Sequence, residues 1–240
     1  ESRLKISLER LCCDSVDILY LHWPCKELPL EPLLEKVDTL YKKGYFKRFG
    51  ISNYSSWEVS KIVNICDREG YIRPTVYQGM YNCLTRDVER ELLPCLREYN
   101  ISFYAYNPLA GGLLTGRYTF EDKQKFNENT SCRFHGLGEV SSKMYQDRFW
   151  HKLYFEAVEC ICKTLPPGRT LVQASYDWLL HHSKLSSSHG DAIVIGASTL
   201  DQFDENMSSI INSKELSDDL VQEMNKSYSK ISGCVPSYFR

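Results

Sequence analysis

The residues of this sequence that could do chemistry are polar and aromatic side chains directly after short apolar runs. Such runs predict buried strands, and in parallel α/β folds the carboxyl ends of the strands carry the functional groups. These end residues are almost free of charge, so we expect them to hold an uncharged, hydrogen-bonding ring that stacks on an aromatic side chain. They are His22-Trp23, Ser52-Asn53, the stretch 78–82, Tyr106-Asn107 and Ala197-Ser198.

Histidine is the side chain whose unperturbed pKa lies near neutrality, and His22 is the one histidine at these strand ends. It could be a functional ionisable group of the site, or it could be a structural histidine of the core. His181, His182 and His189 fall at a helix end and in a polar loop, so we interpret them as solvated surface and expect no metal site. The paired carboxylates of a glycosidase are absent from the strand ends, and the sequence contains no G-x-S-x-G, H-E-x-x-H, Walker A or G-x-G-x-x-G motif.

Two segments could bind phosphate. The first, 102–116, reads SFYAYNPLAGGLLTG: a strand that breaks at a proline and continues into a loop whose paired glycines expose backbone N–H groups. The second is the helix that begins near Ser198 after the last strand, because a helix N-terminus attracts anions. Their ordinary interpretations are a buried strand with a glycine turn, and a plain N-cap. The second segment also carries acids that would repel a phosphate unless they turn outward: Asp201, Asp204 and Glu205.

Strands and helices alternate along the chain, which implies a parallel sheet. It could be an open doubly wound sheet or part of a barrel, which needs eight strands. The strands are expected at 17–23, 46–52, 75–82, 102–106 and 191–197, the last as a fully buried run.

Helices are expected between these strands from their apolar periodicity. They fall at the N-terminus with Leu4, Leu8 and Leu11 on one face, and at about 31–43, 55–69, 87–98, 145–165, 170–182, from 198 onward and 217–230. Pro94 should kink its helix, since it lacks the N–H that a helical turn uses. Ser55 with Glu58 and Thr170 with Gln173 have capping-box spacing. The helix from 198 should bury Leu200, Phe203, Met207 and Ile210.

Composition narrows the class of protein. The chain has 240 residues and a net charge of -2, which argues against a nucleic-acid partner. No apolar run approaches the ~20 residues of a membrane span. The 10 cysteines have no pairing pattern, and the first residues do not resemble a signal peptide, so we expect a reducing, cytoplasmic location. Because the helical pattern begins at the first residues of the chain, an N-terminal portion is expected to be missing.

Several long phrases together resemble the aldo-keto reductases, and more narrowly their aflatoxin-aldehyde and succinic-semialdehyde reductase branch. The phrases are LYLHWP, FGISNYSSWEV, TVYQGMYN, FYAYNPLAGGLLTGRY and the C-terminal SYFR. The resemblance covers essentially the whole chain. It implies one domain over 1–240 that is the C-terminal portion of a (β/α)8 TIM barrel lacking its first three β/α units. It also implies NADPH as the cofactor and a small aldehyde as the substrate, reduced to an alcohol by hydride transfer.

The resemblance assigns roles to the strand-end residues. His22 matches the catalytic histidine that hydrogen-bonds the substrate carbonyl, and Trp23 and Arg240 would also contact substrate, with Arg240 receiving a carboxylate. Ser52, Asn53 and Gln78 would hold the nicotinamide carboxamide, and Tyr106 would stack on the ring. The phosphates would lie along Asn107, Pro108, Leu109, Ala110, Gly111, Gly112, Leu113, Leu114, Thr115, Gly116, Arg117 and Arg133. The adenosine end would contact Ser198, Thr199, Leu200, Asp201, Gln202, Phe203, Asp204, Glu205 and Asn206.

Two departures from the family pattern matter. Gln202 stands where an arginine often contacts the 2′-phosphate, so the preference for NADP depends on Arg117 and Arg133. The family's catalytic aspartate, tyrosine and lysine belong to units that this chain lacks, so we expect the chain alone to be inactive. The alternatives are a cofactor-binding redox-sensing module, as in potassium-channel β subunits, and a truncated pseudoenzyme. A homodimer is also compatible with the sequence.

Overall fold

One parallel sheet brings the strand-end residues to a common edge. The computed structural model describes residues 1–127, 130, 132–136 and 138–240. The strand order is β1-β2-β3-β4-β5, and every neighbouring pair is parallel. The predicted parallel α/β sheet is therefore confirmed. Its strands are β1 (Val16–Leu21), β2 (Phe46–Ser52), β3 (Pro74–Met80), β4 (Ser102–Tyr106) and β5 (Ala192–Ile193).

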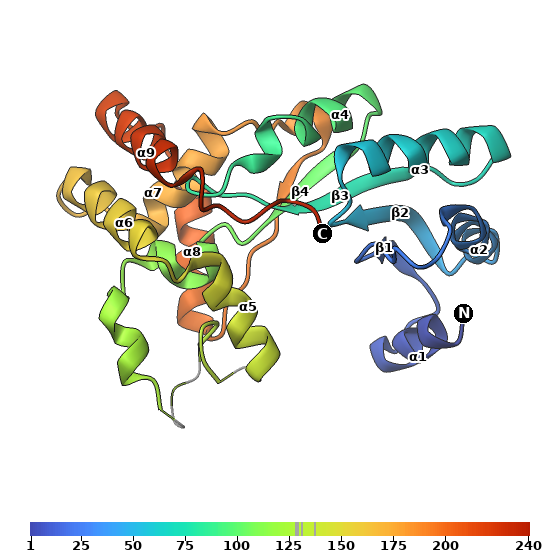
Figure 1. Cartoon of the computed structure of the whole chain (residues 1–240), viewed down its shortest axis with the longest axis horizontal. Helices are drawn as coiled ribbons and strands as arrows, with labels where there is room; N and C mark the ends of the chain where they lie inside the picture. Colours follow the sequence, from blue (N-terminus) through green and yellow to red (C-terminus); the bar gives the residue numbers. More distant parts are fainter. Residues whose placement is uncertain (128–129, 131, 137) are drawn as a thin grey trace.

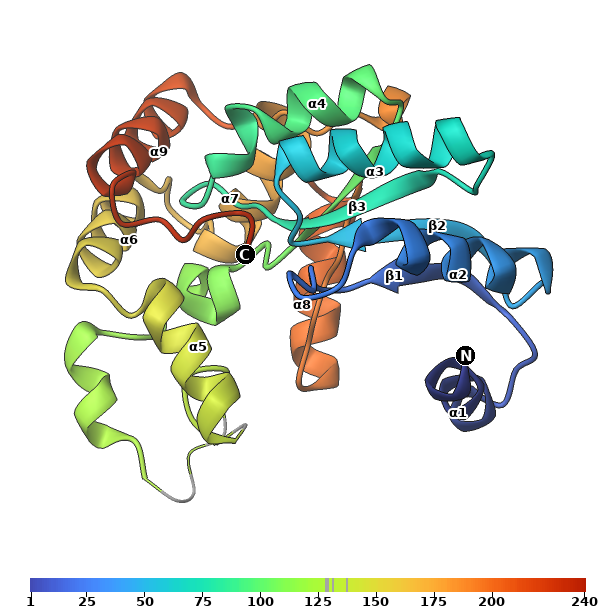
Figure 2. The same ribbon diagram turned by 45° about the vertical axis from the view of Figure 1, so that its right-hand side comes forward.

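Helices cover the outer face of this sheet, and the last ones gather beyond β4 (Figures 1 and 2). α2 and α3 lie over β1 to β3, whereas α6 and α9 pack side by side at the far end. The α-helices are α1 (Ser2–Leu11), α2 (Leu30–Lys42), α3 (Ser56–Glu69), α4 (Leu92–Glu98), α5 (Glu139–Phe149), α6 (Lys152–Thr164), α7 (Leu171–Asp177), α8 (Leu200–Ile211) and α9 (Asp218–Ile231). Shorter helical turns are η1 (Asp87–Glu89), η2 (Ala110–Thr115), η3 (Phe120–Lys125), η4 (Trp178–His182) and η5 (Ser187–His189).

The predicted capping boxes both form. The Glu58 carboxylate accepts the Ser55 backbone N–H at 2.8 Å, which starts α3, and the Thr170 hydroxyl accepts the Gln173 N–H at 3.1 Å, which starts α7. These bonds satisfy N–H groups that have no partner within the first helical turn. The local sequence therefore decides where these two helices begin.

Two expected helices are broken. Instead of one kinked helix at 87–98, the chain forms η1 and then α4, which starts at Leu92 and has Pro94 in its first turn. Proline loses nothing there, because first-turn N–H groups have no helical acceptor. The expected helix at 145–165 is interrupted at Trp150, whose indole is buried and donates to the Phe120 carbonyl at 3.1 Å. Packing of that indole among aromatic rings outweighs helical continuity.

The last strand and the helix after it differ most from expectation. Only Ala192 and Ile193 pair with β4, and neither is fully buried. α8 exposes 81% of Leu200 and 44% of Phe203, whereas its buried residues are Asn206 and Ser209. The prediction that Leu200 and Phe203 are buried was wrong. β5 is an edge strand and α8 packs on α7, which leaves Met207 and Ile210 only partly buried and the first turn of α8 largely open to solvent.

The N-terminal helix also buries less than expected. Leu8 is buried in α1, but Leu11 is 62% exposed. α1 stands beside the sheet rather than on it (Figure 2) and is joined to the end of α2 by the Glu1–Lys43 ion pair at 3.0 Å. The outer strands β1 and β5 are not paired with each other, so these five strands do not close a barrel among themselves.

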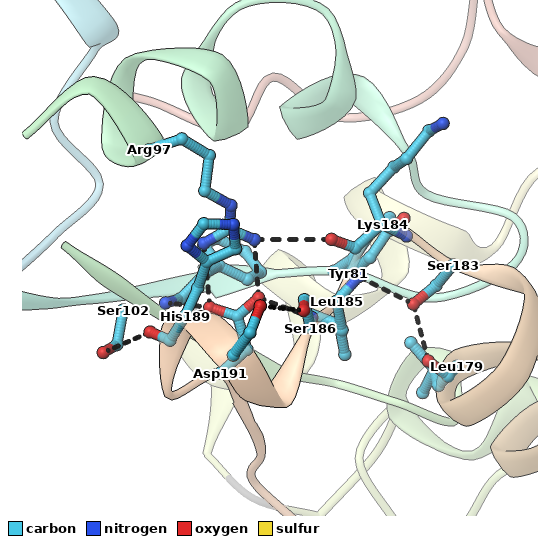
Figure 3. Close-up of polar contacts among 12 residues, drawn as sticks. Tyr81, Arg97, Ser102, Leu179, Ser183, Lys184, Leu185, Ser186, His189 and Asp191 are labelled. Carbon is cyan, nitrogen blue, oxygen red and sulfur yellow. Dashed lines mark hydrogen bonds and ion pairs between the residues drawn. The ribbon is translucent and has the colours of Figure 1, made fainter. Parts of the chain in front are cut away.

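One buried carboxylate ties the C-terminal half of the sheet together (Figure 3). Asp191 accepts two guanidinium bonds from Arg97, at 2.9 and 2.5 Å, and its side chain is 1% exposed. The same carboxylate accepts the backbone N–H groups of Phe103 at 2.8 Å and Ser186 at 2.9 Å. Asp191 thus connects α4, the start of β4 and the loop before β5, which sets the position of the last strand end.

No helix within the described residues is both long enough and apolar enough to cross a lipid bilayer.

Candidate cofactor and active site

The carboxyl ends of the strands open onto a cleft of about 600 Å³. The cleft extends from the end of β1 past β3 and β4 to the first turns of α8. Most of the predicted site residues line it: His22, Trp23, Ser52, Asn53, Gln78, Tyr106, Asn107, Pro108, Leu109, Gly111, Gly112, Thr115, Arg117, Arg133, Ser198, Gln202, Glu205 and Asn206. Their convergence follows from the parallel sheet, although their binding roles stay predictions.

Asn53 connects the first two strand ends. Its amide donates to the His22 carbonyl at 2.8 Å and to the Ser52 hydroxyl at 3.0 Å, so a ligand contact to this side chain must use Oδ1. The backbone is in the left-handed region, with φ of 65°. The Asn53 carbonyl also accepts the N–H of Arg240 at 3.1 Å, which brings the C-terminus to the end of β2 (Figure 1).

Tyr106 ends β4 between the two halves of the cleft. Burial raises the pKa of its phenol, while the neighbouring Arg148 and Arg240 cations act in the opposite direction. The next residue, Asn107, has φ of 56°, and its carbonyl accepts the Asn82 amide at 2.9 Å. This bond holds the backbone at the point where β4 turns into the glycine segment.

The glycine segment is ordered rather than an open loop. Gly111 and Gly112 have φ of 70° and 104°, a backbone conformation that favours glycine. A Cβ at Gly111 would lie 2.8 Å from the Tyr145 ring. Several of its N–H groups bond to carbonyls within the segment, so the expectation of generally exposed backbone donors is corrected. The three apolar residues Ala110, Leu113 and Leu114 are buried, and they and Gly116 do not line the cleft.

One face of α8 closes the far end of the cleft. Gln202, Glu205 and Asn206 recur at helical spacing and point inward, whereas Asp201 and Asp204 are exposed, as phosphate binding would require. Five residues of this segment that were predicted to contact the cofactor do not line the cleft: Thr199, Leu200, Asp201, Phe203 and Asp204. Glu205 is the acid that does face inward, and its carboxylate pairs with Arg117 at 3.2 Å.

Arg240 lies at the rim of the cleft. Its guanidinium stands 4.7 Å from the centre of the Trp23 ring, and it lines a neighbouring hollow together with Arg148. Burial and the nearby Arg148 cation lower the pKa of Arg240. Two guanidinium groups that approach each other in this way favour an anion between them.

Arg148 and Tyr145 are site residues that the sequence did not reveal. Arg148 is only 7% exposed, lines the cleft, and its Nε has no hydrogen-bond partner within the described residues. The Tyr145 ring is approached by Arg133 and Arg148, at 5.6 and 5.8 Å. An arginine in a polar helix ordinarily indicates solvent exposure, so no local signal distinguishes Arg148. Other unpredicted lining residues are Tyr118, Cys132, Met144, Val172, Tyr176, Val194, Ile195 and Gly196.

The three histidines predicted to be solvated surface, His181, His182 and His189, have separate contacts. His182 Nε2 accepts the Leu216 N–H at 2.9 Å, His181 contacts the Ser213 hydroxyl at 3.2 Å, and the His189 carbonyl accepts the Ser102 hydroxyl at 2.9 Å. They therefore act in different parts of the fold.

Comparison with known proteins identifies the family of this chain. The model of the aldo/keto reductase family matches residues 1–229. Human aflatoxin B1 aldehyde reductase member 2 is 42% identical over all of this chain and 67% of its own length, and the rat protein is 42% identical over 65% of its length. Human aldo-keto reductase family 7 member A3 is 40% identical over 99% of this chain and 72% of its own. The chain thus spans about two thirds of the length of these relatives. It belongs to the aldo/keto reductase family.

Proposed function

We propose that this protein binds NADPH in the cleft and takes part in the reduction of aldehydes to alcohols. The observation that carries the proposal is the convergence of His22, Asn53, Gln78 and Tyr106 from four strand ends on one cleft. The names of the relatives, two of them aflatoxin B1 aldehyde reductases, support an aldehyde as the substrate class. In this proposal the five strands form part of a (β/α)8 barrel, and 1–240 is one domain.

The cleft residues suit an extended dinucleotide. Tyr106 offers a flat ring for the nicotinamide, and Asn53 and Gln78 offer amide groups for the carboxamide. Arg117 and Arg133 lie beside the glycine segment, where they would neutralise phosphates. The bound cofactor supplies the hydride, and the protein supplies position and charge.

The substrate would lie between His22 and the two arginines at the rim. His22 would donate a hydrogen bond to the carbonyl oxygen and so stabilise the negative charge that develops there. The unpaired Nε of Arg148 and the guanidinium of Arg240 favour an aldehyde that carries a carboxylate, such as succinic semialdehyde.

Replacing Arg240 by alanine tests this substrate class. In a version whose barrel is completed by the first three β/α units of an aflatoxin-aldehyde reductase, the KM for succinic semialdehyde should rise about tenfold or more, because a charged hydrogen bond is lost. The KM for the uncharged 4-nitrobenzaldehyde should change little, as should both values in Arg240→Lys. Equal effects of Arg240→Ala on the two aldehydes would identify this residue as a structural tail.

A second candidate function is a module that binds the cofactor without turnover. No lysine lines the cleft within the described residues, and burial raises the pKa of the cleft tyrosines Tyr106, Tyr118 and Tyr176. A raised pKa makes a phenol a weaker acid, so none of these three is suited to protonate the product oxygen.

For the reductase, we therefore propose that the proton donor comes from strands that complete the barrel. A cytoplasmic location and a homodimer stay predictions.

A further inference from the structure

Each end of the cleft contains a buried polar atom that has no hydrogen-bond partner within the described residues. Within the described residues, two such atoms belong to side chains that line it, the Nε of Arg148 and the hydroxyl of Tyr176. Arg148 lies near Tyr106 at the proposed substrate end, and Tyr176 lies near Glu205 at the other end. Leaving a buried donor unpaired destabilises the ligand-free protein, so a ligand that pairs with it gains affinity.

Tyr176 occupies the wall between α7 and α8. It is the sixth residue of α7, the helix that packs on α8, and its side chain is completely buried. It lines the cleft beside Val172, Gln202 and Glu205. Burial, reinforced by the Glu205 carboxylate, raises the pKa of the phenol. The hydroxyl therefore stays protonated and can donate one hydrogen bond.

We infer that the Tyr176 hydroxyl binds the adenosine half of the dinucleotide by donating to a neutral acceptor, a ring nitrogen of adenine or an oxygen of its ribose. This inference rests on the proposed dinucleotide cofactor. The Glu205 carboxylate close to Tyr176 already holds the Arg117 guanidinium at 3.2 Å, so a 2′-phosphate at this point would compete with Glu205 for that cation and face its negative charge. A neutral acceptor meets no such repulsion. Tyr176 thus adds affinity for the adenosine half without selecting between NADP and NAD.

Tyr176→Phe removes the hydroxyl and keeps the ring. Binding to the 240-residue chain is measured by titration calorimetry with NADPH, ADP-ribose, 2′-phospho-ADP-ribose and reduced nicotinamide mononucleotide. The Kd should rise about tenfold for the first three probes, the effect of one lost hydrogen bond, and stay unchanged for the mononucleotide. In the absence of ligand, the thermal midpoint of Tyr176→Phe should not fall, because the hydroxyl has no partner in the protein.

Tyr154→Phe is the matched control. Tyr154 is also fully buried, but it lies in α6 and does not line the cleft. This variant should bind all four probes as the unaltered chain does.

Three outcomes would overturn the inference. They are unaltered NADPH affinity in Tyr176→Phe, a loss confined to the probes with a 2′-phosphate, and a lowered thermal midpoint without ligand. A different result would contradict the proposed function.

If the completed barrel binds NADPH with the predicted Tyr176 dependence but reduces no aldehyde, the proposed reaction is wrong and the binding role of Tyr176 stands. If no probe binds to the unaltered chain, both are wrong.

Discussion

Replacing Asp191 by alanine is expected to lower the free energy of unfolding by about 3–5 kcal/mol, the range for removing one partner of a buried ion pair. The Asp191 side chain is 1% exposed and accepts four hydrogen bonds, two from Arg97 and one each from the N–H groups of Phe103 and Ser186. Alanine leaves the Arg97 guanidinium without its anion and two backbone donors without acceptors. The loss should therefore exceed that of an ordinary hydrogen bond.

Urea unfolding followed by far-ultraviolet circular dichroism measures this loss. The matched control is Asp17→Ala, because Asp17 pairs with Lys47 at 2.8 Å while both side chains are more than 70% exposed. Exposed pairs contribute little, so the control should unfold at the same urea concentration as the unaltered chain. If both variants unfolded alike, Asp191 would not organise the C-terminal half of the sheet.

The second large effect concerns turnover. With NADPH and 4-nitrobenzaldehyde, these 240 residues should react about 10²–10⁴-fold more slowly than the same chain completed by the first three β/α units of an aflatoxin-aldehyde reductase. That factor is the usual contribution of a positioned general acid. The expected loss follows from the residues of the cleft. His22 lines it, but no lysine does within the described residues, and burial raises the pKa of Tyr106, Tyr118 and Tyr176, which makes them weaker acids.

The control for this experiment is NADPH binding by the chain alone. Binding without turnover agrees with a cleft that supplies the cofactor site and lacks the proton donor. Turnover by the 240 residues at the rate of the completed protein would show that a residue of this chain protonates the product, and Tyr145 would then be the first to replace by phenylalanine. If the chain alone bound no NADPH, the proposed cofactor site itself would be wrong.

Local patterns in the sequence determined most of the elements and the edge on which the site lies. The apolar runs that end at His22, Ser52 and Tyr106 predicted parallel strands, and parallel strands necessarily bring their carboxyl ends to one edge. The capping boxes predicted two helix starts for an equally local reason, since their bonds join residues three positions apart. The face of α8 that lines the cleft was not predicted, since all residues of 198–206 were assigned to the cofactor, and the structure selects Gln202, Glu205 and Asn206.

What lies opposite each face was decided by tertiary structure alone. Periodicity indicates that α8 has an apolar side, but not whether anything covers it, and Leu200 and Phe203 are exposed. Asp191 and Arg97 are 94 positions apart, and no local pattern indicates that they pair. Arg148 and Tyr176 resemble ordinary helix residues in the sequence. Only packing against distant segments buries their polar atoms beside the cleft without partners, and burial without a partner is the property that makes them candidates for ligand binding.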